Sequence, residues 1–358
     1  MAAAARDSHS EFDQFLNLSR QIGTDILKTQ GAGGNTSLKR DGTMWVKASG
    51  TWLAHANDRD IMVPVRVAPL VDALRAGDPR AEKATDFVVG ELNTSGLRPS
   101  IETSFHAALN SPVVAHYHCV NAIALSVLQK RNQLLAEKLT PTGLKWTTVP
   151  YRRPGTPLAR EVDAAANSDP DVLILFNHGI IVTGTTVDEV ASKIANVSAA
   201  LNMPTREVSG PSLDALKTMS AGSGYLPASD IESHQLALSP ESIRLATAGS
   251  MYPDHVIFLG TEIGVLDQGQ SVSDLVASYA GAGATTPKLI IVPGMGVLLS
   301  DELTAGGQVM ARCLAEVVAR IPDSADVLYL SDADEYELTN WEAEQYRQAL
   351  DRGASRGE

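Results

Sequence analysis

Short apolar stretches alternate along this chain with segments of helical periodicity, and that alternation most constrains the fold. Three strand-like stretches, TSLK, MWVKAS and DIMVPVR, follow a predicted helix at 11–27. Later, PVVAHYHC, DVLILFNHG and GIIVTG have the apolar character of buried strands, while SIETSFHAALN, NAIALSVLQKR and VDEVASKIANVSAALNM have helical spacing. Because both tight turns and helices join the strands, we predict an α/β fold in which helices cover a partly antiparallel sheet.

A segment rich in Ser, Gly and Pro, residues 209–224, is predicted to be a linker. We therefore expect two domains, 1–208 and 209–358, and a chain of 358 residues is long enough for both. In the second domain, YPDHVIFLGTEIGVLD, PKLIIVPGMGVLLS and DVLYLS are predicted strands. TAGGQVMARCLAEVVARI and the tail DEYELTNWEAEQYRQALD are predicted helices.

The two halves share a local pattern of strand, glycine turn, strand and helix. DVLILFNHGIIVTG with its following helix parallels PKLIIVPGMGVLLS with its own, and His178 then corresponds to Met295. Two interpretations are open. The second domain is a degenerate repeat of the first, or both halves contain the same common supersecondary unit.

Charge and cysteine content exclude several classes of partner. With 42 acidic residues against 29 basic ones, the net charge is −13. This charge disfavours binding to nucleic acid and to anionic membranes, and no apolar run is long enough to span a bilayer. The two cysteines, Cys119 and Cys313, and an N-terminus without an apolar signal core lead us to expect a cytoplasmic protein.

His116-Tyr117-His118 lies inside one of the apolar strands. Residues two apart on a strand point to the same face, so both imidazoles can reach one ion. His178 ends the strand VLILF and is the third candidate. Three imidazoles with an open position are typical of a catalytic zinc site. On its own, however, His-x-His equally describes two hydrogen-bonded histidines on a half-buried strand.

Polar residues in three other segments complete the candidate site. Glu102 falls near the start of a helix for which Ser100 is the expected N-cap, so it either stabilises the helix dipole or serves as a general base. The loop Gly31–Ser37 and the element Lys47–Thr51 offer backbone N–H groups, hydroxyls and an ammonium to an anion. The loop lacks the lysine of a Walker motif, and a flexible turn is the other interpretation.

Taken in order, GGNTS, KASG, RPSIETSFHAAL, VVAHYHCVNAIAL and LFNHGIIVTG resemble the class II aldolase/adducin family over about residues 11–205. The resemblance implies a layered α/β/α aldolase-like domain followed by a second, smaller α/β domain. It implies zinc, or another divalent transition metal, bound by His116, His118 and His178, with Glu102 as catalytic acid/base. It assigns the substrate phosphate to Gly34, Asn35, Ser37, Ser49, Gly50 and Ser100, and we expect the Lys47 ammonium to bind the same phosphate. Ile101 departs from the family pattern, which usually has a second serine there.

The segments VKASG and RPSIET of the first half, with YPDHVIFLG and TNWEAEQYRQAL of the second, are most similar to the aldolase part of bifunctional rhamnulose-1-phosphate aldolase/alcohol dehydrogenases. No dehydrogenase cofactor loop is present, which implies a stand-alone aldolase of carbohydrate metabolism. We therefore expect a lyase that cleaves a ketose 1-phosphate through a metal-stabilised enediolate. The family also implies a homo-oligomer, usually a tetramer.

Three alternatives remain open: a sugar-phosphate 4-epimerase, a lyase for a non-phosphorylated hydroxy-keto substrate, and a non-catalytic, adducin-like interaction module. A module of the last kind would be expected to lose the metal histidines, and all three are present.

Overall fold

The computed structural model describes residues 2–340 and divides into two compact units. Unit 1 comprises residues up to 122 together with 132–202, and unit 2 comprises 123–131 together with the chain from 203. The short segment 123–131 joins unit 2 although it lies between two parts of unit 1, which the sequence does not suggest. The domain boundary at residue 208 stays a prediction.

Unit 1 is built on a seven-stranded sheet of order β3-β2-β1-β4-β7-β6-β5. Neighbouring strands are antiparallel except β5 and β6, which are parallel. The strands are β1 Asn35–Arg40, β2 Thr43–Lys47, β3 Met62–Arg66, β4 Val113–Tyr117, β5 Trp146–Val149, β6 Val172–Leu175 and β7 Gly179–Gly184. The predicted, partly antiparallel α/β fold is therefore confirmed.

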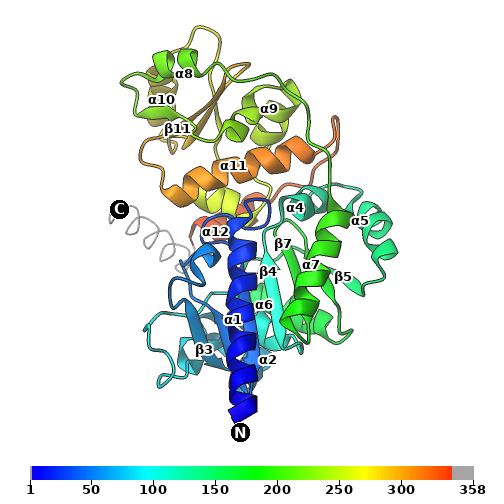
Figure 1. Ribbon diagram of the computed structural model, residues 1–358. Coiled ribbons are helices and arrows are strands. Elements are labelled where there is room, and N and C mark those ends of the chain that lie inside the picture. Colours follow the sequence, from blue (N-terminus) through cyan, green and yellow to red (C-terminus); the bar gives the residue numbers. More distant parts are fainter. Residues whose placement is uncertain (1, 341–358) are drawn as a thin grey trace. The chain divides into compact units, whose positions relative to one another are not determined.

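Helices cover both faces of this sheet (Figure 1). On one face α1 packs on β1 and α7, and α7 packs on β4 and β7; on the other face α2, α3 and α6 contact one another. The helices are α1 Ala2–Thr24, α2 Val67–Ala76, α3 Thr103–Ala108, α5 Arg131–Leu139, α6 Thr156–Ala166 and α7 Val187–Leu201, with short 3-10 turns at Leu53–His55, Pro79–Glu82, Thr85–Phe87 and Thr140–Thr142. Helix α4, Val120–Ser126, begins in unit 1, and its residues from 123 on belong to unit 2.

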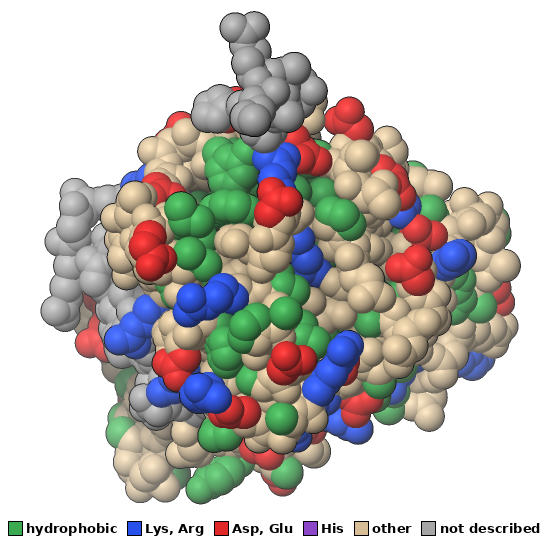
Figure 2. All heavy atoms as spheres, turned by 90° about the horizontal axis from the view of Figure 1, so that it is seen from below, with side chains coloured by type: hydrophobic (Ala, Val, Ile, Leu, Met, Phe, Trp, Pro, Cys, Tyr) green, Lys and Arg blue, Asp and Glu red, His purple; other side chains and the backbone are tan. Residues whose placement is uncertain are grey.

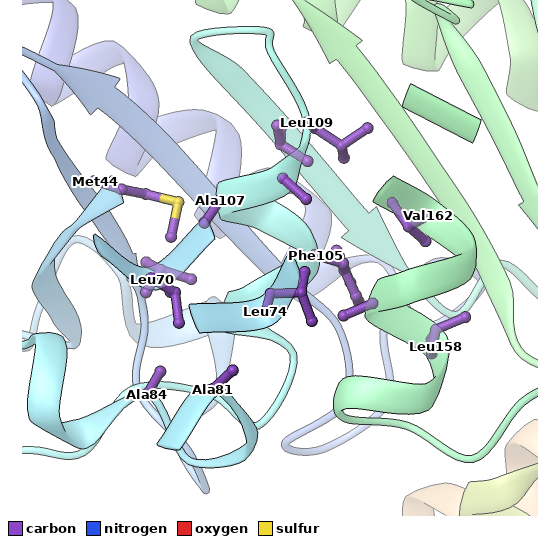
Figure 3. Close-up of a cluster of buried hydrophobic side chains, with 14 of the residues drawn as sticks. Met44, Leu70, Leu74, Ala81, Ala84, Phe105, Ala107, Leu109, Leu158 and Val162 are labelled. Atoms are coloured by element: carbon purple, nitrogen blue, oxygen red, sulfur yellow. The ribbon is translucent and has the colours of Figure 1, made fainter. Parts of the chain in front are cut away.

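The core on the α3 face determines where that helix lies. Figure 3 shows Phe105 of α3 among Leu70 and Leu74 of α2 and Leu158 and Val162 of α6, all fully or almost fully buried. Every second residue of the underlying strands also points into this cluster, because successive side chains on a strand point to opposite faces of the sheet. This packing fixes α3, and with it the residues at its N-terminus, against the sheet.

Unit 2 has a four-stranded sheet of order β8-β11-β10-β9. Its strands are β8 Tyr225–Pro227, β9 Gly264–Val265, β10 Leu289–Val292 and β11 Gly296–Ser300. Its helices are α8 Leu213–Ser220, α9 Pro240–Thr247, α10 Val272–Gly281, α11 Ala305–Arg320 and α12 Asp332–Thr339, with a 3-10 helix at Ile231–Ala237 and a π-helix at His255–Leu259. The presence of this second, smaller α/β unit agrees with the predicted fold class.

The two sheets share more than the hairpin noticed in the sequence. In the orders β4-β7-β6-β5 and β8-β11-β10-β9, the first two pairings are antiparallel and the last is parallel. Both hairpins have three-residue turns whose middle residue, Asn177 or Gly294, has a positive φ. The degenerate repeat stays a prediction; if it is correct, the strand registers make Pro227 the counterpart of His116.

Three predicted elements of the second half are wrong. The expected linker contains α8, because Leu216 and its apolar neighbours at helical spacing pack into the unit 2 core. Residues 326–331 form only an isolated bridge between Val327 and Leu128 instead of a strand. The run HVIFL forms a π-helix instead of the predicted strand. The prediction failed because a short apolar run that is buried on all sides is compatible with both helix and strand.

The predicted C-terminal helix is present as α12 up to Thr339, and the rest of that prediction lies outside the described residues. Among the helices of the described chain, none combines the length and the apolar character needed to cross a membrane. Figure 2 shows one face of the molecule, on which acidic and basic side chains are interspersed. The described part of that face has no broad patch of positive charge.

Candidate metal centre

Strand β4 brings two histidines to the α3 face of the sheet. His116 lies on β4 opposite Asn35 of β1 and Ile181 of β7, and His118 follows the last residue of the strand. Nδ1 of His116 lies 3.0 Å from the Ile180 carbonyl oxygen, which only accepts, so Nδ1 carries the hydrogen. Nε2 of His116 therefore keeps its lone pair, and it lies 3.5 Å from a Glu102 oxygen.

The third histidine is held by the turn between β6 and β7. Asn177 has a φ of +55°, a conformation that asparagine tolerates better than most residues. Gly179 follows His178, and a Cβ atom there would lie 2.6 Å from the Tyr117 carbonyl oxygen. The absence of that Cβ lets the turn approach β4, and Nε2 of His178 lies 3.4 Å from the second Glu102 oxygen.

The three imidazoles form a compact, buried group with Glu102. Their ring centroids are 4.9–5.0 Å apart in every pair. The group consists of Glu102, His116, His118 and His178. Each offers one ligand atom, and these four atoms all lie within 4.8 Å of one another. Imidazole nitrogens with one carboxylate are a donor set typical of zinc and related divalent ions. The predicted ligands therefore meet at one place and fit such an ion.

Glu102 is oriented toward the histidines and does not cap the helix. The predicted N-cap, Ser100, is wrong: α3 begins at Thr103, its N-cap residue is Glu102, and the Glu102 side chain makes no capping hydrogen bond. The Asn35 amide donates to Glu102 Oε2 over 2.8 Å. Burial raises the pKa of Glu102, but the positive charge of the nearby imidazoles in their protonated form, together with the Asn35 amide, outweighs burial and brings it to about 2. The carboxylate is therefore ionised at neutral pH.

The segments predicted to bind phosphate lie next to this cluster and next to each other. The Ser49 N–H donates to the Arg98 carbonyl, and the Ser100 N–H donates to the Lys47 carbonyl. The Ser100 hydroxyl lies 3.1 Å from the Asn35 amide nitrogen. The fold thus gathers the glycine-rich loop, the 47–51 element and the start of the 100–102 turn. Phosphate binding by these residues stays a prediction.

The remaining predicted phosphate residues have contacts of their own within the protein. The Lys47 ammonium is almost fully buried and donates to the carbonyls of Ala32 and Thr51, 2.7 Å away in each case, so it ties two loops together. Ser37 contacts His106 through its hydroxyl. Gly34 has a φ of +63°, and a Cβ there would approach the His116 carbonyl oxygen to 2.9 Å. Gly50 also has a positive φ, at a turn.

Three contacts of the site were missed by reasoning from the sequence. A Cβ on Gly33 would lie 2.8 Å from Nδ1 of His118, and Gly179 makes the close approach to Tyr117 described above. The Gln30 amide also donates to the His118 carbonyl. The only signal available in the sequence was that a glycine stands directly after His178 and several stand in the Gly31–Ser37 loop.

Comparison with known proteins finds a matching family and several curated relatives. Residues 14–204 match the family described as Class II Aldolase and Adducin N-terminal domain. The chain is 27% identical over 199 residues to "Uncharacterized oxidoreductase YuxG" of Bacillus subtilis (strain 168), covering 52% of this chain and 28% of that protein. Over 179 residues it is 29% identical to an L-fuculose phosphate aldolase of Methanococcus vannielii, covering 48% of this chain and 84% of the relative.

A further relative has a different reaction in its name. The chain is 34% identical over 110 residues to a 3-oxo-tetronate 4-phosphate decarboxylase of Escherichia coli (strain K12), covering 28% of this chain and 52% of the relative. The matched segments thus span well under two thirds of two of these three relatives.

Proposed function

Because the chain belongs to the Class II Aldolase and Adducin N-terminal domain family, we propose that it is a metal-dependent lyase that cleaves a carbon–carbon bond of a ketose 1-phosphate such as rhamnulose 1-phosphate. The observation that carries this proposal is the buried cluster of three histidines around an ionised glutamate. A non-catalytic interaction module has no use for four converging donors. We further propose, from the family, that the protein assembles as a homo-oligomer.

In this proposal His116, His118 and His178 hold zinc or a related divalent ion, with Glu102 beside it. A bound dication supplies Lewis-acid stabilisation for the negative charge left on the substrate when its carbon–carbon bond breaks. Neutral imidazoles leave the ion its full charge, and the Ile180 carbonyl keeps the ligating nitrogen of His116 free of hydrogen.

Glu102 transfers the proton in this reaction. Its carboxyl group is buried from water and held by the Asn35 amide, so it would take a proton from the nucleophilic carbon in the direction of condensation and, once protonated, give that proton back to the same carbon in the direction of cleavage. General acid–base catalysis of this kind also requires a fixed position, which the packing of Phe105 in α3 provides.

The phosphate of the substrate is proposed to bind where the glycine-rich loop, Ser49–Gly50 and Ser100 meet. The names of two relatives, L-fuculose phosphate aldolase and 3-oxo-tetronate 4-phosphate decarboxylase, support a phosphorylated substrate. Lys47 lies between the two loops and contributes positive charge, although its ammonium donates to the backbone carbonyls of Ala32 and Thr51.

Decarboxylation of a 3-oxo acid phosphate is a second candidate reaction. It is favoured by the 34% identity to a 3-oxo-tetronate 4-phosphate decarboxylase, which exceeds the 29% identity to a fuculose phosphate aldolase, although over a shorter segment. Loss of carbon dioxide leaves negative charge next to a carbonyl group, as aldol cleavage does, so the same residues can serve either reaction.

The test is to incubate the zinc-loaded protein with a panel of ketose 1-phosphates and with 3-oxo-tetronate 4-phosphate. Released dihydroxyacetone phosphate indicates the aldolase, and released carbon dioxide indicates the decarboxylase. His178→Ala, prepared in parallel, should be inactive on the substrate that the wild type cleaves. An active His178→Ala variant, or a wild type that releases neither product, would contradict the proposal.

A further inference from the structure

His106 is a buried histidine that the proposed reaction does not use. It lies on α3 one turn after Glu102, and its side chain faces the start of β1, where Asn35 and Ser37 stand two residues apart on the same face. His106, Asn35 and Ser37 are all at most 2% exposed. A polar ring that is completely buried is usually hydrogen-bonded, and both nitrogens of this ring have partners.

The direction of every hydrogen bond in this group follows from Glu102. The Asn35 amide nitrogen lies 2.8 Å from Oε2 of Glu102, so the Asn35 side chain directs its NH₂ group at Glu102 and donates to it. The same NH₂ group faces the Ser100 hydroxyl. The carbonyl oxygen of Asn35 then points the other way, and its contact is Nε2 of His106.

His106 must therefore carry its hydrogen on Nε2, because the Asn35 carbonyl oxygen only accepts. Nδ1 is then an acceptor, and the Ser37 hydroxyl donates to it over 2.8 Å. Burial lowers the pKa of His106 well below its ordinary value, which agrees with a neutral ring. The chain of donors runs from Ser37 through His106 and Asn35 to Glu102.

We infer that His106 is a positioning residue, which holds the Asn35 amide in the one orientation that supports the Glu102 carboxylate. If the amide turned over, its oxygen would face the carboxylate, and the His106 N–H would face an NH₂ group. His106 thereby couples the loop proposed to bind phosphate to the residue proposed to transfer the proton. This inference rests on the proposed function for the catalytic role of Glu102. The chain of hydrogen bonds is observed independently of that function.

Two substitutions at His106 separate hydrogen bonding from packing. His106 stacks on Phe105 with ring centroids 4.7 Å apart, so His106→Phe keeps an aromatic ring and removes both hydrogen bonds. His106→Gln removes the ring but places an amide N–H near the position of Nε2. Ser104→Ala is the matched control, because Ser104 is equally buried in the same helix and its hydroxyl bonds to the Ala81 carbonyl instead.

We expect His106→Phe to lower kcat by about 10–100-fold, the usual effect of losing a residue that orients a metal site, while metal content stays that of the wild type. His106→Gln should keep more activity than His106→Phe, and Ser104→Ala should match the wild type. In the Co²⁺-loaded protein, the visible absorption bands should shift in the phenylalanine variant more than in the glutamine variant, because Glu102 lies beside the ion.

The reverse order, with phenylalanine better than glutamine, would show a packing role and overturn the inference, as would wild-type behaviour of both variants. Loss of metal in His106→Phe would also overturn it. Should that variant fail to fold, as judged by circular dichroism, Ser37→Ala tests the same chain, and unchanged kcat and Co²⁺ bands would refute it. If the wild type cleaves no substrate of the panel, the proposed function fails, and the Co²⁺ spectra alone decide the role of His106.

Discussion

Glu102 combines two properties that rarely occur together in one residue, almost complete burial and full ionisation. It is 5% exposed, and the imidazoles and the Asn35 amide keep its pKa near 2. An unpaired buried carboxylate would instead be neutral, because burial alone raises the pKa of an acid. The surroundings of Glu102 therefore keep it in the ionised form, the only form that can accept a proton.

Replacing Glu102 by Gln removes the proton acceptor and keeps the shape of the side chain. We expect turnover to fall by about 10²–10⁴-fold, the usual contribution of general acid–base catalysis, because the amide cannot take a proton. Zinc should remain bound by the three histidines, as measured by atomic spectroscopy. Glu91→Gln, at an exposed position, is the control. Unchanged turnover would remove Glu102 from the mechanism.

His255 in unit 2 predicts a dependence of stability on pH. Burial lowers its pKa from 6.5 to about 4, and its Nδ1 accepts from the Met251 N–H. Between pH 6.5 and 4 the unfolded chain binds a proton at His255 that the folded chain does not bind, so stability is lost as the pH falls through this range. A shift of this size amounts to about 3 kcal/mol at the acid end.

The measurement is urea unfolding at pH 7 and pH 5. His255→Asn keeps an acceptor near Nδ1 and has no titrating ring, so its loss of stability between the two pH values should be smaller than that of the wild type. His55→Asn should lose as much as the wild type, because His55 is not buried. Equal losses in His255→Asn and the wild type would contradict this account.

At the scale of elements, β4 is the centre of the site, and its neighbours are adapted to it. The turn between β6 and β7 approaches β4 because Gly179 has no side chain, and the loop before β1 approaches it because Gly33 and Gly34 have none. Each histidine ligand thus has a glycine against it or directly beside it in sequence. Element packing, more than any single hydrogen bond, sets the distances within the cluster.

Gly179→Ala should disturb this packing. The new Cβ would meet a backbone carbonyl, that of Tyr117, which cannot move without shifting β4. We expect a loss of about 1–3 kcal/mol in unfolding free energy, typical of an overpacked core, together with weaker metal binding in a competition assay with a chelator. Gly90→Ala is the control, since its Cβ would have nothing within 4 Å and should leave both values unchanged.

Prediction of elements from the sequence succeeded where periodicity was sustained and failed where it was short. Helix α7, for example, has an apolar face at helical spacing, and it was predicted. The π-helix at His255–Leu259 and the helix α8 were not predicted, because one is apolar on all sides and the other lies within a polar, glycine-containing stretch. In both, contacts with the rest of unit 2 decide the conformation.

At the scale of the whole molecule, all four donors of the metal cluster belong to unit 1. A ligand that binds only the folded state stabilises it by mass action, by about 2.7 kcal/mol at a hundredfold excess over its Kd. Added zinc should therefore raise the unfolding temperature of the wild type and leave that of His178→Ala unchanged. Scanning calorimetry with and without a chelator measures this, and an equal rise in both proteins would refute the ligand assignment.

Hydrogen exchange locates the same effect within the chain. Zinc should slow exchange in β4 and in the β6–β7 hairpin of unit 1, because these elements carry the histidines. The corresponding strands β8, β10 and β11 of unit 2 should exchange as before, since Pro227 and Met295 stand where the histidines would be. Protection in unit 2 alone would place the metal elsewhere.

The sequence by itself determined which residues are available for chemistry and which elements carry them, because strand alternation and helical spacing are properties of neighbouring residues. It placed His116 and His118 on one face of a strand and Glu102 near a helix start. Only the tertiary structure brought Glu102 and His178 to that face, since the pairing of β4 with β1 and β7 joins segments far apart in the chain. The same long-range contacts decided that Lys47 would hold two loops and that His106 would face Asn35.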